Sequence, residues 1–189
     1  LLRQQLVISI AAGLRLADLS RWLGDYTKIV RAMPNTPALI GAGITGLCAM
    51  PAVSMAERLG AERILQAVGS TLWIAEEDQM DAVTAVSGSG PAYVFLFIEA
   101  LQQGARELGL SPVQARQLSI DTVLGAARLA AQSDEAAAVL RERVTSKGGT
   151  TEAALRTMAE RGVKEGFIAG IIAANARGRQ LGEQLGKDD

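Results

Sequence analysis

The sequence predicts an α/β part followed by an all-helical part, with a boundary near residue 75. Up to that point, short β-branched apolar runs alternate with segments of helical period, which indicates a largely parallel sheet. Beyond it no run resembles a strand. The composition is 49% hydrophobic but only 4% aromatic, which is typical of closely packed helices. We therefore expect domains at residues 1–75 and 76–189.

The elements of the first part follow from apolar periodicity and from glycine and proline positions. The run Leu6-Val-Ile-Ser-Ile10 is continuously apolar and β-branched, as in a buried strand. Further strands are expected at 28–32, 43–49 and 70–74, with helices at 15–23 and 54–68. This part looks incomplete, because four strands with one or two helices make a poor doubly wound domain and no G-x-G-x-x-G follows a strand. We expect a further N-terminal half ahead of it.

The second part is predicted to be a series of helices. Gly88-Ser-Gly-Pro91 is expected to break the first of them, and Ser111-Pro112 is typical of a helix start. The predicted helices are 77–86, 92–108, 112–131, 134–143, 151–161 and 163–185.

The composition excludes several function classes. The chain has no histidine, which excludes Ser-His-Asp hydrolysis, histidine-ligated zinc and histidine proton relays, so no metal site is expected. Any catalysis then depends on a bound cofactor. The net charge of −1 indicates no nucleic-acid partner. We also expect no membrane partner, because the apolar stretch 167–174 is too short to span a bilayer and no secretory signal opens the chain. The single cysteine fits a reducing, cytoplasmic compartment.

Three loops of the first half combine small, rigid and polar residues. Ala11-Ala12-Gly13 follows a strand, where open α/β sheets bind ligands, although a plain packing turn is an alternative. In Met33-Pro-Asn-Thr-Pro37 the prolines hold Asn35 and Thr36 in a rigid loop, which suits either a ligand site or a structural turn. Ser87-Gly-Ser-Gly-Pro91 opens an apolar helix; capping explains Ser89 and Pro91 but not both glycines.

The stretch Val144-Thr-Ser-Lys-Gly-Gly-Thr-Thr151 precedes a predicted helix. Thr150 or Thr151 can cap that helix, whose free N–H groups form an anion site. Gly148 and Gly149 let successive amides point inward, and Ser146 adds a hydroxyl donor. A small carboxylate suits this loop better than a nucleotide phosphate, since no strand precedes it. A capped helix without a ligand is the alternative.

The last helix carries small residues at every fourth position. Such a row lets another helix approach closely, and its cost in helix propensity requires a close partner. A second copy of the chain is favoured as that partner over intrachain packing. The row consists of Gly162, Gly166, Gly170, Ala174, Gly178, Gly182 and Gly186.

Taken together, these stretches resemble the Δ1-pyrroline-5-carboxylate reductase family over roughly residues 6–185. The most specific parts are "DAVTAVSGSGPAYVFLFIEAL" at 81–101 and "VTSKGGTTEAAL" at 144–155, with "VRAMPNTP" at 30–37 in support. The resemblance implies a reductase of the last step of proline biosynthesis. It implies the C-terminal part of a Rossmann-type domain for NADPH or NADH, whose N-terminal part is missing here, and a helical domain that binds substrate and forms a homodimer. Assembly beyond a dimer is left open.

The resemblance also implies site residues. Ser146 and the backbone at Gly149, Thr150 and Thr151 would hold the substrate carboxylate, and the Thr151 hydroxyl would hydrogen-bond the ring nitrogen, which makes Thr151 the catalytic residue. Asp134 corresponds to an acidic position of the substrate region. The residues expected to line the cofactor are Ala11, Ala12, Gly13, Met33, Asn35, Pro37, Ser87, Gly88, Ser89 and Gly90.

Two features depart from the family pattern. The phosphate-binding glycine motif is absent, and Lys147 stands where the family often has proline. Two alternative functions also remain: another two-domain reductase of the β-hydroxyacid dehydrogenase type, and a helical dimerisation fragment without activity. The first usually relies on a lysine on an interdomain helix, and 92–108 contains none.

Overall fold

The computed structural model describes residues 2–187, and the chain divides into two compact units. One consists of Leu1–Pro91 together with Ala169–Asp189, and the other of Ala92–Ile168. The expected domain boundary near residue 75 stays a prediction. The two units are defined by contacts within one chain, whereas the helical domain is expected to form between the helices of two chains.

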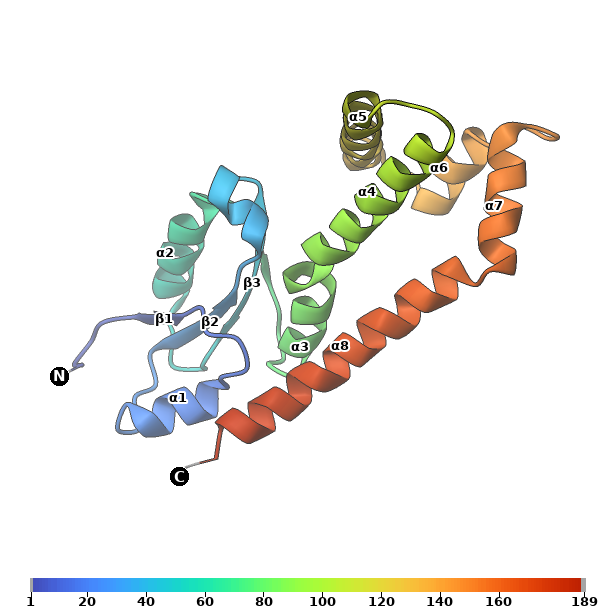
Figure 1. Ribbon diagram of the computed structural model, residues 1–189. Coiled ribbons are helices and arrows are strands. Elements are labelled where there is room, and N and C mark those ends of the chain that lie inside the picture. The colour runs from blue at the N-terminus through green and yellow to red at the C-terminus, as the bar shows by residue number, and fades with distance from the viewer. Residues whose placement is uncertain (1, 188–189) are drawn as a thin grey trace. The chain divides into compact units, whose positions relative to one another are not determined.

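A four-stranded mixed sheet forms the centre of the first unit (Figure 1). Its strands lie in the order β1 (Val7–Ser9), β2 (Ile29–Met33), β3 (Gly43–Ala49) and β4 (Gly69–Trp73). All four strands were expected, but β2 and β3 pair antiparallel, whereas β1–β2 and β3–β4 are parallel. The largely parallel sheet predicted from the alternation is therefore corrected. The connection from β2 to β3 contains only the short 3-10 helix η1 (Thr36–Ile40), and a parallel crossover needs a dozen or more residues.

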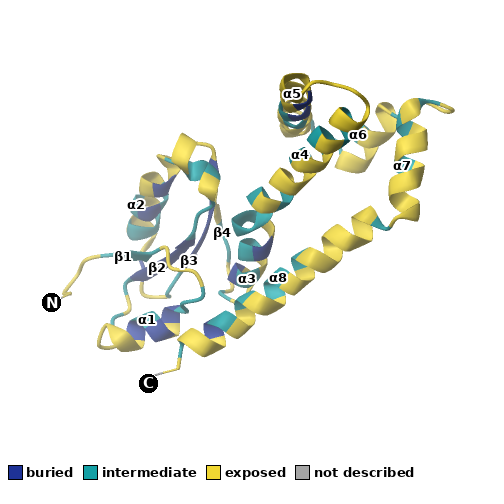
Figure 2. Cartoon of the chain, in the orientation of Figure 1, coloured by how far each residue is buried: buried dark blue, intermediate teal, exposed yellow. Residues whose placement is uncertain are grey.

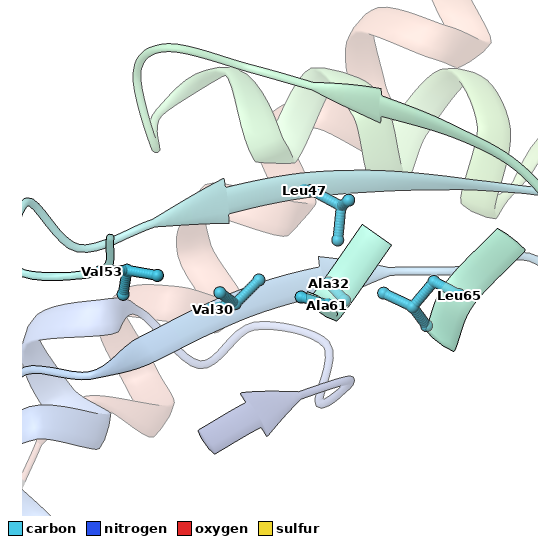
Figure 3. Close-up of a cluster of buried hydrophobic side chains, with 6 residues drawn as sticks. All are labelled: Val30, Ala32, Leu47, Val53, Ala61 and Leu65. Atoms are coloured by element: carbon cyan, nitrogen blue, oxygen red, sulfur yellow. The ribbon is translucent and has the colours of Figure 1, made fainter. Parts of the chain in front are cut away.

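Helices cover both faces of this sheet. On one face α2 (Met55–Gln66) packs Ala61 and Leu65 against Val30, Ala32 and Leu47, and Val53 joins the same cluster (Figure 3). On the other face Leu16 of α1 (Leu16–Trp22) and Met80 of α3 (Gln79–Val83) enclose Ile29 and Cys48. The first unit thus has a core made of aliphatic side chains, as the composition indicated.

A partly buried ion pair joins β2 to the segment just ahead of α3. Arg31 is only 4% exposed, and its Nη1 lies 3.0 Å from Oε1 of Glu77. The same Glu77 oxygen accepts a hydrogen bond of 2.7 Å from the backbone N–H of Leu16, at the first turn of α1. Glu77 therefore neutralises a buried cation and satisfies a helix-terminal donor at once.

We expect Glu77→Ala to lower the free energy of unfolding by about 3 kcal/mol, because it leaves the Arg31 charge buried without its partner. Glu76→Ala is the matched control, since Glu76 is exposed, and it should change stability by less than about 0.5 kcal/mol. Urea unfolding followed by circular dichroism measures both. Equal stability of the two variants would contradict the role given to Glu77.

The start of α2 combines a helix cap with an ion pair. Ser54 Oγ accepts from the Glu57 N–H at 3.3 Å, and the Ser54 N–H donates to Glu57 Oε2 at 2.9 Å. Glu57 also lies 2.8 Å from Lys28 Nζ. The hydrogen bonds from Lys28 and Ser54 lower the pKa of Glu57 from 4.5 to about 2. The fold therefore favours the ionised form of Glu57.

A carboxyl group whose pKa is lower in the folded state stabilises the fold fully above its ordinary pKa and loses that contribution as the pH falls to the folded value. For Glu57 this window runs from about 4.5 down to about 2. We expect the melting temperature of the parent protein to exceed that of Glu57→Gln at pH 6, and the difference to shrink towards pH 2. Melting curves across that range measure it. A difference that does not change with pH would contradict the ionic contribution.

The segment Gly88–Pro91 does not break the helix, contrary to the sequence prediction. One helical stretch, Gln79–Glu107, runs from α3 through a π-helical turn, η2 (Thr84–Gly88), into α4 (Gly90–Glu107). The Ser89 N–H donates to the Thr84 carbonyl, five residues back, at 2.8 Å. A π-turn widens the helix locally, which lets the chain pass Pro91 without ending.

The second unit contains α5 (Pro112–Ala131), α6 (Ala137–Arg143), α7 (Thr150–Glu160) and parts of α4 and α8 (Val163–Leu185). The limits of α5 and α8 agree with the predicted ones, and Ser111 and Gln114 form a capping box at the predicted start of α5. Helix α6 begins three residues later than expected. The element order confirms the fold class, an α/β part followed by helices.

The second unit has almost no core of its own (Figure 2). Residues 92–168 are all described, and within them only Ala115 and Ser119 are buried. Four consecutive large apolar side chains of α4, at 94–97, are exposed, and at 100° per residue they surround the helix. By length and composition alone, the described stretch Gln79–Glu107 passes as a candidate membrane span, with 6% of its apolar window buried. A large exposed apolar surface of this kind indicates a site of interaction with another molecule.

The row of small residues on α8 divides into two halves. A Cβ at Gly178 would lie 3.2 Å from Asp81, and one at Gly182 would lie 3.1 Å from Arg15. These glycines therefore pack against their own chain, which corrects the preference for a second copy at this end. Gly166 and Gly170 have no described atom within 4 Å of an added Cβ, so that half of the row remains open for a partner.

Candidate functional site

The carboxyl ends of β1 and β2 lie at the same edge of the sheet, because the two strands are parallel. The predicted cofactor residues Ala11, Ala12 and Gly13 follow β1. The segment 33–37 begins with the last residue of β2 and extends beyond that strand. Ala11 and Ala12 are exposed, and Gly13 has φ +79°, which favours glycine. The sheet thus brings these two loops together, at the edge where open α/β sheets bind ligands.

The Ser87–Gly90 segment contacts the second of these loops, the one that follows β2. A Cβ at Gly88 would lie 3.3 Å from Cε of Met33, and Asn35 Nδ2 donates to the Ser87 carbonyl at 3.1 Å. Pro37 lies in the first turn of η1. The structure therefore joins Met33 and Asn35 to Ser87 and Gly88 within the first unit.

The predicted cofactor residues include small residues with space beside them. Ala11, Ala12 and Gly90 are small, and no described atom lies within 4 Å of an added Cβ at Gly90. Ser87 and Ser89 are the polar side chains of the Ser87–Gly90 segment, although Ser87 Oγ already donates to the Val83 carbonyl at 2.8 Å. Small side chains thus leave the backbone accessible at these positions.

The second set of predicted residues lies at the start of α7. Gly149 is the N-cap residue and no side chain caps this helix, so the expected cap by Thr150 or Thr151 is wrong. Within the described chain, the backbone N–H groups of Thr150, Thr151 and Glu152 have no acceptor. Three free donors at the positive end of a helix form an anion site.

The two glycines ahead of α7 are held by the chain itself. Gly148 has φ +74°, and its N–H donates to Glu152 Oε2 at 2.7 Å. The Gly149 N–H donates to the Ser146 carbonyl at 3.0 Å. A Cβ at Gly149 would lie 2.5 Å from Ser146 Oγ, so only glycine lets that hydroxyl approach the helix start. The inward-pointing amides of Gly148 and Gly149 that the sequence suggested are therefore already bonded.

Two further residues that the sequence singled out, Asp134 and Lys147, are less closely associated with the start of α7. Asp134 is exposed in the loop before α6, and no hydrogen bond or ion pair of the described chain joins it to Ser146 or 148–151. Lys147 is likewise exposed. A cavity of about 580 Å³ lies beside α7, lined by Thr145, Glu152 and residues of α6 and α8, but not by the predicted substrate residues.

Sequence reasoning missed two carboxylates. Glu152, the third residue of α7, binds the Gly148 amide, and Glu77 binds Arg31 and the Leu16 amide. A glutamate three residues after a helix cap commonly reaches back to the preceding backbone. That rule would have identified Glu152 and placed the cap at Gly149. The partners of Glu77 lie far from it in sequence, so no local pattern indicates them.

Comparisons with known proteins agree on one family. The model of the pyrroline-5-carboxylate reductase dimerisation domain matches residues 77–181. A pyrroline-5-carboxylate reductase of Pseudomonas aeruginosa is 48% identical over 97% of this chain and 67% of its own length. One from Synechocystis is 43% identical over 95% of this chain and 66% of its own length. The chain thus spans about two thirds of these curated relatives.

Solved structures show the same likeness. The pyrroline-5-carboxylate reductase of Coxiella burnetii has a TM-score of 0.89 and 46% identity, over 93% of this chain and 65% of its own. The pyrroline carboxylate reductase of Plasmodium falciparum, solved with NADP bound, has a TM-score of 0.87 and 32% identity, over 94% of this chain and 71% of its own.

Proposed function

Because the chain belongs to the pyrroline-5-carboxylate reductase family, we propose that the complete protein reduces the C=N bond of Δ1-pyrroline-5-carboxylate to L-proline with NADPH or NADH. The observation that carries this proposal is the start of α7, where three backbone N–H groups lack an acceptor and Ser146 Oγ approaches Gly149. Free donors at a helix start suit the carboxylate of a small cyclic imine.

In this proposal the chain binds and orients the reactants. The N–H groups of Thr150 and Thr151, with the Ser146 hydroxyl, hold the substrate carboxylate, and Gly148 and Gly149 shape the loop. The Thr151 hydroxyl donates a hydrogen bond to the ring nitrogen and so orients the C=N bond, while solvent supplies the proton. When bound, the nicotinamide cofactor supplies the hydride. The edge formed by 11–13, 33–37 and 87–90 holds its ring.

We further propose that a second copy covers the apolar surface of the second unit, in a homodimer formed by the C-terminal helices. The match to a dimerisation domain supports this, as do the exposed apolar face of α4 and the open row at Gly166 and Gly170. A protein partner is favoured over lipid because the matched domain is one of dimerisation. Asp134 would act from the partner chain. A cytoplasmic location and the absence of a nucleic-acid partner belong to the same proposal.

We expect Thr151→Ala, made in the complete protein, to lower kcat/KM for pyrroline-5-carboxylate about 10- to 100-fold, since one hydrogen bond to a charged group contributes about 1.5–3 kcal/mol. Thr151→Ser keeps the hydroxyl and should retain most of the activity. Oxidation of NADPH or NADH, followed at saturating cofactor, measures both variants, and light scattering checks that each remains a dimer. Unchanged turnover in Thr151→Ala would remove Thr151 from the mechanism. A parent protein that dimerises but shows no turnover would favour the non-enzymatic alternative.

Gly170→Leu is expected to dissociate or unfold the dimer, because a leucine in the open half of the row keeps a neighbouring helix away. Gly60→Leu in α2 is the matched control, since an added Cβ at Gly60 also has no described atom within 4 Å. Sedimentation velocity and thermal melting measure both variants. A Gly170→Leu protein with the parent mass and melting temperature would refute the packing proposed here.

A further inference from the structure

The carbonyl group of Ser87 lacks its usual helical donor. In an α-helix a carbonyl accepts from the N–H four residues later, and four residues after Ser87 stands Pro91, which has no N–H. Ser87 lies within the π-helical turn η2 and is only partly exposed. A carbonyl in this position needs a donor from elsewhere in the chain.

Asn35 supplies that donor. Its Nδ2 lies 3.1 Å from the Ser87 oxygen, across a separation of 52 residues. Its Oδ1 accepts the N–H of Ile44, at the start of β3, at 3.0 Å. Because an N–H can only donate, the bond to Ile44 fixes which end of the amide is oxygen, and the nitrogen must then face Ser87.

Asn35 makes these bonds in place of the one its position favours. It is the N-cap residue of η1, where an asparagine side chain normally accepts a hydrogen bond from the first turn, but no such cap is formed. Both ends of the side chain instead bind other segments of the first unit. Asn35 therefore connects the loop after β2, in which it lies, to the start of β3 and to the entry to α4.

We infer that Asn35 is a positioning residue, which holds Ser87–Gly90 beside the exit of β2 by replacing the donor that Pro91 lacks. Gly88 then faces Met33, with an added Cβ only 3.3 Å from Cε. This inference rests on the proposed function for its effect on catalysis. It gives the Asn35 side chain a role within the protein in addition to the proposed cofactor contact, since one N–H and one oxygen lone pair of its amide already have partners there.

The test is a double-mutant cycle in the complete protein. Asn35→Ala should lower kcat/KM for pyrroline-5-carboxylate by roughly tenfold or more, mainly through kcat, because small displacements of positioned groups are costly. Pro91→Ala restores a backbone N–H for Ser87, so adding Asn35→Ala to it should cost less than about threefold. Asn35→Asp keeps the acceptor for Ile44 but loses the donor, and should resemble Asn35→Ala. Leu39→Ala, which changes an exposed side chain of η1, is the control and should match the parent.

Hydrogen exchange gives a readout that does not depend on activity. The Ser89 N–H is bonded to the Thr84 carbonyl within the turn, so we expect a peptide covering 84–92 to exchange faster in Asn35→Ala and at the parent rate in Leu39→Ala. The double variant should exchange like Pro91→Ala alone. Mass spectrometry of the protein without ligands measures this.

The outcomes separate the two proposals. Equal exchange at 84–92 in the parent and Asn35→Ala overturns the inference, whatever the activity. The inference is also overturned if Asn35→Ala keeps the parent kcat/KM. It is likewise overturned if Asn35→Ala lowers kcat/KM by the same factor in the Pro91→Ala background as in the parent. A merely structural role would lower the melting temperature while leaving kcat of the folded protein unchanged. A parent protein without turnover refutes the proposed function, and the exchange cycle then decides the inference alone.

Discussion

The helical unit at 92–168 cannot bury its own apolar surface, and the rest of the proposed function depends on how that surface is covered. Ordering a helical residue costs about 1–2 kcal/mol of backbone entropy, which only burial and hydrogen bonding offset. Within this unit, all of it described, only Ala115 and Ser119 are buried. The start of α7 lies in the same unit. A dimer would therefore supply the missing core and hold the start of α7, the proposed substrate loop, in a fixed place.

The first unit differs from the second, because it has a hydrophobic core of its own. Its polar contacts between side chains and backbone hold loops in place. Glu77 joins β2 to the start of α1, and Asn35 joins the exit of β2 to β3 and to the entry of α4. Glu77 accepts from a backbone N–H at the start of α1, which has no acceptor within its helix. Asn35 donates to the Ser87 carbonyl, which lacks a helical donor because Pro91 has no N–H. These contacts fix the sheet edge at which we propose that the cofactor binds.

The sequence predicted the elements well wherever local rules act. The limits of β3, α5 and α8 follow from apolar periodicity and caps, and three separate motifs indicated the family. The direction of β3 was missed, although the short link after β2 could have shown it. The passage of the helix through Pro91 was also missed, because its replacement donor, Asn35, lies 52 residues away. Such long-range partners leave no local pattern.

The concentration dependence of thermal unfolding tests most directly whether a second chain completes the helical unit. If burial between two copies supplies the missing core, the melting midpoint of the complete protein should rise as its concentration rises, and light scattering should give the mass of a dimer or a multiple of it. A monomeric mass with a midpoint that does not change with concentration would contradict the account. The apolar face of α4 would then need another cover.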